Sequence, residues 1–257
     1  MGDWMHNLPT GWMALVVFAI TYLVATGILA IIFAIAKGTR ARIFKDVSPA
    51  MLSPLGVIFG LMVVFIAAQV WNDIDHARAA VNREASAIRG VTLLAHSFPG
   101  ETETRIRSLI RQHVDEAVSI EWPSMAQQSA SLTVVAPALS DALQSVLLLE
   151  PKSEGQITAQ REMVEGLEDA MDARRQRIIA SRSSVNWIKW NCMFGLALCM
   201  VIAIAAVHCD NRGAATLAVG IFATGVALSV LLILSHDRPF SGEIAIKPDF
   251  LLQTRPE

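Results

Sequence analysis

The chain has 257 residues, of which 53% are hydrophobic and only 17% are charged, and its formal net charge is −2. Soluble domains usually carry about 25% charged residues, so this composition excludes a disordered chain, a basic nucleic-acid-binding domain and a disulfide scaffold. The apolar excess belongs either to a soluble core or to membrane spans, and its distribution along the chain decides between them.

Four long stretches without any charged residue hold most of the apolar side chains. They cover Trp12–Ala36, Met51–Trp71, Trp190–Val207 and Ala214–Ser235. Each has at least 18 residues, about the length at which a helix crosses the hydrocarbon layer of a membrane. Soluble cores rarely contain four such stretches, so the sequence predicts four transmembrane helices.

The first stretch is expected to be a retained helix and not a cleaved signal peptide. No Lys or Arg precedes Lys37, and the apolar run is longer than the roughly 7–15 residues of a signal peptide. Tryptophans near the ends of the stretches are interpreted as interfacial anchors. These tryptophans are Trp4, Trp12, Trp71, Trp187 and Trp190.

The second stretch has one face of small apolar residues that ends near Gln69. Gly56 and Gly60 form a G-x-x-x-G pair, which lets another helix approach closely. This face is either a packing surface inside a helix bundle or the wall of a narrow pore, repeated around an oligomer axis, that gates by dewetting. The residues that share the face at helical spacing are Ser53, Val57, Gly60, Leu61, Val64 and Ala68.

Residues 72–186 have a different composition, with 16 of the 23 acidic and 12 of the 21 basic residues, and are expected to face water. Their periodicity predicts helices over 73–97, 101–120, 124–149 and 156–183, the first continuing the second span and the last leading into the third span. Pro123 is expected to end the second helix and to push Trp122 out of the helical region. Pro137 is expected to kink or divide the third helix.

No strand pattern is present, so the predicted fold is all-α, with a helical domain inserted between the second and third spans. The expected parts are 1–72 (two spans and their loop), 73–186 (helical domain), 187–236 (two spans) and 237–257 (C-terminal tail). Near the spans, ten Lys or Arg lie on the side of the helical domain and five on the other, which places this domain and both termini in the cytoplasm. The dense charge of the loop 37–45 argues for the reverse orientation.

Motifs for nucleotide binding, hydrolysis or EF-hand calcium binding are not found. His76 and His113 are interpreted as ordinary helix-face residues, and Cys192 and Cys199 as small buried side chains. We therefore expect no enzyme activity, no catalytic residue, no metal and no cofactor.

Two segments of the chain resemble bestrophin anion channels. Ser53-Pro54-Leu55 with Gly60-Leu61 and Trp71-Asn72 resembles their second transmembrane helix, and Pro239-Phe240-Ser241-Gly242-Glu243 resembles the segment after their last one. Over roughly residues 10–250 the chain is similar to the bacterial bestrophin-like domain family. The residues that match motifs are Pro54, Trp71, Asn72, Glu84, Glu121, Trp122, Pro123, Arg174, Pro239, Phe240 and Gly242.

The resemblance implies an oligomeric, anion-conducting channel, pentameric in bestrophins, with its neck at Ser53, Val57 and Leu61 and its mouth at Gln69. Bestrophins bind calcium through several acidic residues after Pro-Phe-Gly, but here Glu243 stands alone, so no metal site is expected. The expected partners are copies of the chain, membrane lipid and ions, but no nucleic acid, and the expected location is a bacterial inner membrane. The alternative is a membrane-anchored sensor or scaffold whose helical domain binds a ligand or a partner protein.

Overall fold

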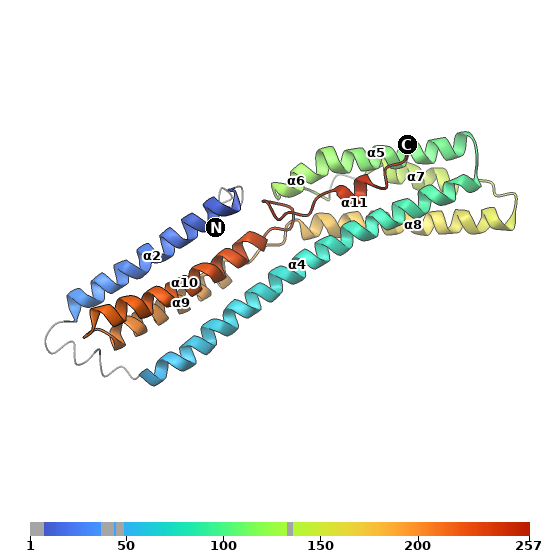
Figure 1. The fold of residues 1–257 in the computed structure, drawn as a ribbon. Helices are drawn as coiled ribbons and strands as arrows, with labels where there is room; N and C mark the ends of the chain where they lie inside the picture. Colours follow the sequence, from blue (N-terminus) through green and yellow to red (C-terminus); the bar gives the residue numbers. More distant parts are fainter. Residues whose placement is uncertain (1–7, 37–43, 45–48, 133–135) are drawn as a thin grey trace. The chain divides into compact units, whose positions relative to one another are not determined.

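The computed structural model describes residues 8–36, 44, 49–132 and 136–257. Within these residues the regular elements are all helical and no strand occurs (Figure 1), which confirms the all-α prediction. Trp4, Lys37 and most of the 37–45 loop lie outside the described residues. The main helices are α2 (Thr10–Ile35), α4 (Leu52–Leu94), α5 (Glu101–Glu116), α6 (Trp122–Ala126), α7 (Pro137–Leu147), α8 (Glu154–Ala180), α9 (Trp187–Val207), α10 (Arg212–His236) and α11 (Asp249–Leu252).

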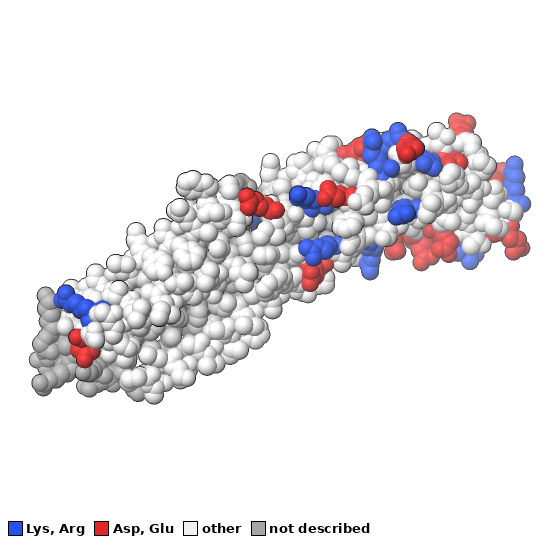
Figure 2. All heavy atoms as spheres, viewed as in Figure 1, with Lys and Arg blue, Asp and Glu red and all other residues white. Residues whose placement is uncertain are grey.

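The chain divides into two compact units. Unit 1 comprises residues 1–71 and 184–237, and unit 2 comprises residues 72–183 and 238–257. On the face drawn in Figure 2, charged side chains gather over the helices of unit 2, whereas the surface of α2 and α10 is almost free of them. The C-terminal segment, which the sequence analysis treated as a separate tail, belongs to unit 2.

Unit 1 contains α2, α9, α10 and the apolar first half of α4. Its core joins Leu29 of α2, Val201 of α9 and Val219 of α10. Four helices in the described residues are long and apolar enough to cross a membrane, as predicted. The protein is therefore a multi-pass membrane protein.

Helix α4 runs without interruption from Leu52 to Leu94, as the sequence predicts. No Gly or Pro lies between Trp71 and Asp73, so nothing breaks the hydrogen-bond ladder where the composition changes from apolar to polar. The charge-free part that can cross a membrane ends at Trp71. The polar second half belongs to unit 2.

Unit 2 has its own hydrophobic core. Ile88 of α4, Ile110 of α5, Leu139 of α7 and Leu167 of α8 are fully buried in it, together with Leu251 of α11. Each helix contributes one apolar stripe at three-to-four spacing, because that spacing repeats along one side of an α-helix. Helix α8 ends at Ala180, and residues 181–186 separate it from α9.

The prediction that Trp122 leaves the helical region was wrong. Its φ and ψ are −59° and −49°, and it begins α6 with Pro123 in the first turn. Helix α5 passes into a single π-helical turn, Ala117–Glu121, before α6 begins. A proline in a first helical turn removes no bond that the helix would otherwise form, so the chain continues as a new helix. Pro137 likewise starts α7 and divides the third predicted stretch.

Candidate functional site

The face of α4 that was predicted to line a pore makes little contact within the chain. All six residues of this face are exposed; the exposed fraction of Leu61 is 53% and that of Val64 is 62%. We call this set the α4 free face. Its members are Ser53, Val57, Gly60, Leu61, Val64 and Ala68.

The opposite side of α4 packs against the rest of unit 1. Phe59, Ile66 and Val70 are buried, and the rings of Phe59 and Phe222 of α10 lie 5.4 Å apart. Helix α4 is therefore attached by one side only. The α4 free face is a mostly apolar surface that the described residues leave without a partner.

The two glycines of the G-x-x-x-G pair have different surroundings. A Cβ added at Gly56 would lie 3.7 Å from Met200 Cε of α9, whereas one added at Gly60 would meet nothing within 4 Å. Only Gly56 therefore lies beside another helix of the same chain. The close-packing interpretation of Gly60 finds no partner among the described residues.

Polar and aromatic groups mark the end of the charge-free part of α4. Gln69 Oε1 accepts a hydrogen bond from Lys189 Nζ of α9. The ring of Trp71 lies 6.1 Å from that of His236 of α10. Pro54 and Asn72, the other motif residues of this helix, are exposed.

A buried network of charged side chains lies inside unit 2. Arg177 of α8 has no exposed side-chain area, and its Nε donates to Glu84 Oε2 at 2.7 Å while its Nη2 donates to Glu84 Oε1 at 3.0 Å. The same Nη2 lies 2.8 Å from Glu121 Oε2. Arg174 Nε donates to Glu121 Oε1 at 2.7 Å. Two arginines thus balance two carboxylates, and one guanidinium bridges both acids.

His113 of α5 completes this network. Its Nε2 lies 2.9 Å from Glu84 Oε1 in fully buried surroundings. An ionised carboxylate can only accept, so this nitrogen donates. The interpretation of His113 as a helix-face residue did not include this hydrogen bond to a buried acid.

The electrostatics of the network favour the charged forms of Glu84 and Arg177. Burial by itself would raise the pKa of Glu84, but the charge of Arg177 and hydrogen bonds from His113 and Arg177 lower that pKa to about 2. Burial would lower the pKa of Arg177, but Glu84 and Glu121 raise it above its ordinary value. A buried carboxylate with three donors is stable as an anion.

Trp122 links this network to the C-terminal segment. Its ring lies 4.8 Å from the Arg177 guanidinium carbon and packs edge-on against Phe240 at 5.6 Å between centroids. Its Nε1 donates to the Ile246 carbonyl at 3.0 Å.

The C-terminal segment turns at the motif residue Gly242. This residue has a φ of 86°, a conformation that favours glycine, and Ile246 N donates to the carbonyl of Pro239 at 2.8 Å. The segment therefore folds back onto Trp122.

The fold brings together motif residues that are far apart in the sequence, Glu84, Glu121 and Arg174 in one network with Trp122 and Phe240 beside it. Sequence reasoning missed Arg177 at its centre. The spacing along α8 could have indicated it, because Arg177 lies ten residues after Leu167 and three after Arg174, on the buried side of this helix. A charged residue on an apolar stripe indicates a buried ion pair.

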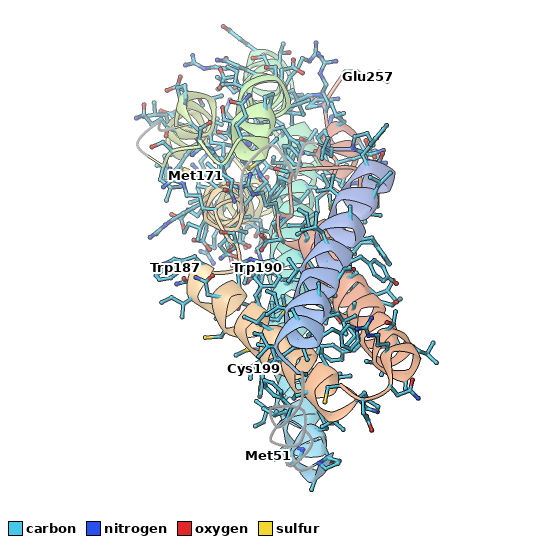
Figure 3. The ribbon with its side chains drawn as sticks, turned by 90° about the vertical axis from the view of Figure 1, so that its left-hand side faces the viewer. Met51, Met171, Trp187, Trp190, Cys199 and Glu257 are labelled. Atoms are coloured by element: carbon cyan, nitrogen blue, oxygen red, sulfur yellow. The ribbon has the colours of Figure 1, made fainter. Side chains whose placement is uncertain are left out.

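Two predictions about α9 were wrong. Cys192 and Cys199 are exposed in the chain, because the buried side of α9 is formed by residues such as Met193 and Ala197. Trp190 is buried and stacks on Phe194, whereas Trp187 is 69% exposed at the start of the helix (Figure 3). Of the two, only Trp187 has the exposure of an interfacial anchor.

In the described part of the chain, no group of three His, Cys, Asp or Glu side chains is placed to hold a metal ion. The buried network has its donors and acceptors matched. Its geometry suits a structural role better than a catalytic one.

The comparisons with known proteins agree with one another. The sequence model of the bestrophin-like domain matches residues 19–251. A crystal structure of a mutant bacterial bestrophin homologue from Klebsiella pneumoniae superposes with a TM-score of 0.69 at 11% identity, covering 94% of this chain and 97% of that one. No curated protein matches the sequence.

Proposed function

Because the chain belongs to the bestrophin-like domain family, we propose that it is one subunit of an oligomeric ion channel in which the α4 free face lines a narrow neck. Membership supports a channel at the level of the family. The observation that carries the proposal for this chain is the exposure of the α4 free face, opposite a side on which Phe59, Ile66 and Val70 are buried. Copies arranged around an axis would turn these faces toward one another.

The chemistry of this face suits a constriction that gates by excluding water. Val57, Leu61 and Val64 are apolar, Gly60 and Ala68 are small, and no charged residue lies between Met51 and Trp71. Apolar rings in a narrow pore gate ion flow by dewetting. The face carries no charge of either sign, so our proposal that the channel conducts anions, with Gln69 at one mouth, rests on the resemblance to bestrophin anion channels.

We further propose that the protein lies in a bacterial inner membrane with unit 2 and both termini in the cytoplasm. The larger number of Lys and Arg on the side of the helical domain supports this orientation.

Flux through liposomes containing the purified protein tests the neck. We expect Val57→Trp and Leu61→Trp to reduce anion flux to the level of empty liposomes, because an indole at either position would fill the constriction. Leu23→Trp on α2, where Leu23 is 74% exposed, is the matched control and should leave flux unchanged. No flux from the unmodified protein, or full flux from both neck variants, would overturn the proposal and favour the sensor or scaffold.

Replacing chloride by gluconate on one side of a planar bilayer tests the selectivity. With potassium equal on both sides, the reversal potential should shift toward the chloride equilibrium potential. A reversal potential that stays near zero would show that the channel conducts cations. The proposed selectivity would then be wrong, while the proposed neck would stand.

A further inference from the structure

A polar groove lies between the second half of α4 and the C-terminal segment, within unit 2. One part is a cavity of about 270 Å³, lined by Asn82, Ser86 and Arg89 of α4 and by Gln253 near the chain end. A second hollow of about 190 Å³ shares Asn82 with the first. We call the two together the α4–tail groove.

The first cavity contains hydrogen-bond donors and no carboxylate. Arg89 is its only charged lining residue, and among the described residues no carboxylate lies within 4 Å of its guanidinium nitrogens. The Asn82 and Gln253 amides and the Ser86 hydroxyl also make no hydrogen bond to a described residue. Four exposed donor groups from two segments of the chain therefore line one space without a hydrogen bond to a described residue.

The second hollow adds to the positive charge. Arg78 and Lys247 line it together with one carboxylate, Asp249. With Arg89, three cations and one acid line the groove, and Arg78 also lies 3.9 Å from Asp75 Oδ1. Residues 72–186 as a whole carry 12 basic and 16 acidic residues, a net charge of −4. The groove is therefore positive in a segment that is negative.

Another hollow of unit 2 provides a comparison. It lies beside α5 and contains Arg107 and Arg111, but Glu103 and Glu257 line it as well, and Glu103 lies 3.4 Å from Arg107 Nη1. Arg107 therefore has an acidic neighbour, and Arg111 Nε donates to the Pro256 carbonyl at 3.1 Å. Among the described residues Arg89 has neither kind of partner, which distinguishes the α4–tail groove.

We propose that the α4–tail groove binds a small oxyanion of the phosphate type. The guanidinium fork matches two oxygens of such an anion, and the amides and the hydroxyl can donate to the others. Donors from helix α4 and from the turn after α11 suit a tetrahedral anion, which accepts from several directions. Free phosphate and the phosphate of a lipid headgroup share this chemistry. The site does not depend on the proposed channel function.

Titration of the full-length protein in detergent with inorganic phosphate tests the site, with ionic strength held constant by chloride. We expect saturable binding by calorimetry and a matching rise in the unfolding temperature. Arg89→Gln should weaken binding about tenfold or more, as expected for the loss of a charge-assisted bond. Ser86→Asp should abolish binding, because it introduces a carboxylate into the groove.

Arg83→Gln is the matched control. Arg83 is an exposed arginine of α4 that does not line the groove, so this variant should bind phosphate as the unmodified protein does. Helix content by circular dichroism verifies that each variant folds. Equal weakening by Arg83→Gln and Arg89→Gln would indicate only a general charge effect and would overturn the proposal.

A second arm distinguishes the source of the phosphate. Native mass spectrometry after extraction from phosphatidylglycerol vesicles should show retained lipid that Arg89→Gln loses, if a headgroup occupies the groove. Retained lipid with no phosphate binding supports the headgroup, and phosphate binding without retained lipid supports the free anion. Absence of Arg89-dependent binding in both arms overturns the proposal.

Discussion

Arg177 is the centre of the buried charge network in unit 2. It is fully buried and pairs with two carboxylates, Glu84 and Glu121, and its guanidinium lies over the ring of Trp122. A buried ion pair adds little stability compared with apolar side chains in place of both partners. Removing one partner alone, however, leaves the other as an unpaired buried charge. The network therefore makes unit 2 sensitive to single substitutions at its centre.

Arg177→Met should destabilise unit 2 by about 3–5 kcal/mol, the usual cost of breaking a buried pair from one side. In thermal unfolding this corresponds to a fall of roughly 10 °C in Tm. Arg175→Met is the matched control, since Arg175 is an exposed neighbour on the same helix, and its Tm should not change. Equal Tm values for the two variants would contradict the central role of Arg177.

The lowered pKa of Glu84 predicts a loss of stability in acid. Unfolded Glu84 takes up a proton below about pH 4.5, whereas the folded residue stays ionised down to about pH 2. The unfolded state therefore binds more protons in this window, and acid favours it. The stabilisation by Glu84 is complete above about pH 4.5 and is lost as the pH falls toward 2.

Comparison with Glu84→Gln isolates this effect. The Tm difference between the unmodified protein and Glu84→Gln should be largest near neutral pH and should shrink between about pH 4.5 and pH 2. A difference that stays constant over this range would mean that Glu84 has an ordinary pKa.

At the scale of elements, α4 and α8 contact each other at two places. Beside the Glu84–Arg177 pair, Gly166 of α8 faces α4, where an added Cβ would lie 2.9 Å from Val91 Cγ2 and 3.6 Å from the Ala87 carbonyl oxygen. Gly166 therefore permits an approach that a larger residue would prevent.

Gly166→Ala should lower the Tm, because Val91 is β-branched and cannot move its methyl group without repacking. Gly90→Ala is the control on α4, since a Cβ there would meet nothing within 4 Å. That variant should leave the Tm unchanged or raise it, because alanine is favoured over glycine within a helix by roughly 1 kcal/mol. The opposite order of the two Tm values would refute the close approach.

At the scale of the whole molecule, the channel proposal requires several copies. A single chain exposes the α4 free face but encloses no axis with it. We expect mass measurement in detergent, by light scattering with the detergent contribution subtracted, to give a closed oligomer, with five copies as the family resemblance implies. A monomer under conditions that preserve helix content would exclude an axial pore lined by α4.

Much of this architecture could be predicted from the sequence. The four charge-free runs, the unbroken passage of α4 past Trp71 and the helical domain follow from local composition and periodicity, which act over a few turns of one helix. The division at Pro137 follows from the missing N–H of proline.

Other features depend on groups that are distant in the sequence. Glu84 and Arg177 pair across 93 positions, and the burial of His113 and the exposure of Cys199 depend on which side of each helix meets a neighbour. Trp122 is helical although Pro123 follows it, because Pro123 lies in the first turn of α6. The sequence alone determined that this chain enters a membrane and carries a helical domain, because hydrophobic length and spacing are local properties. Only the tertiary structure decided which charges are buried together and which face of α4 remains free, because these depend on packing between elements.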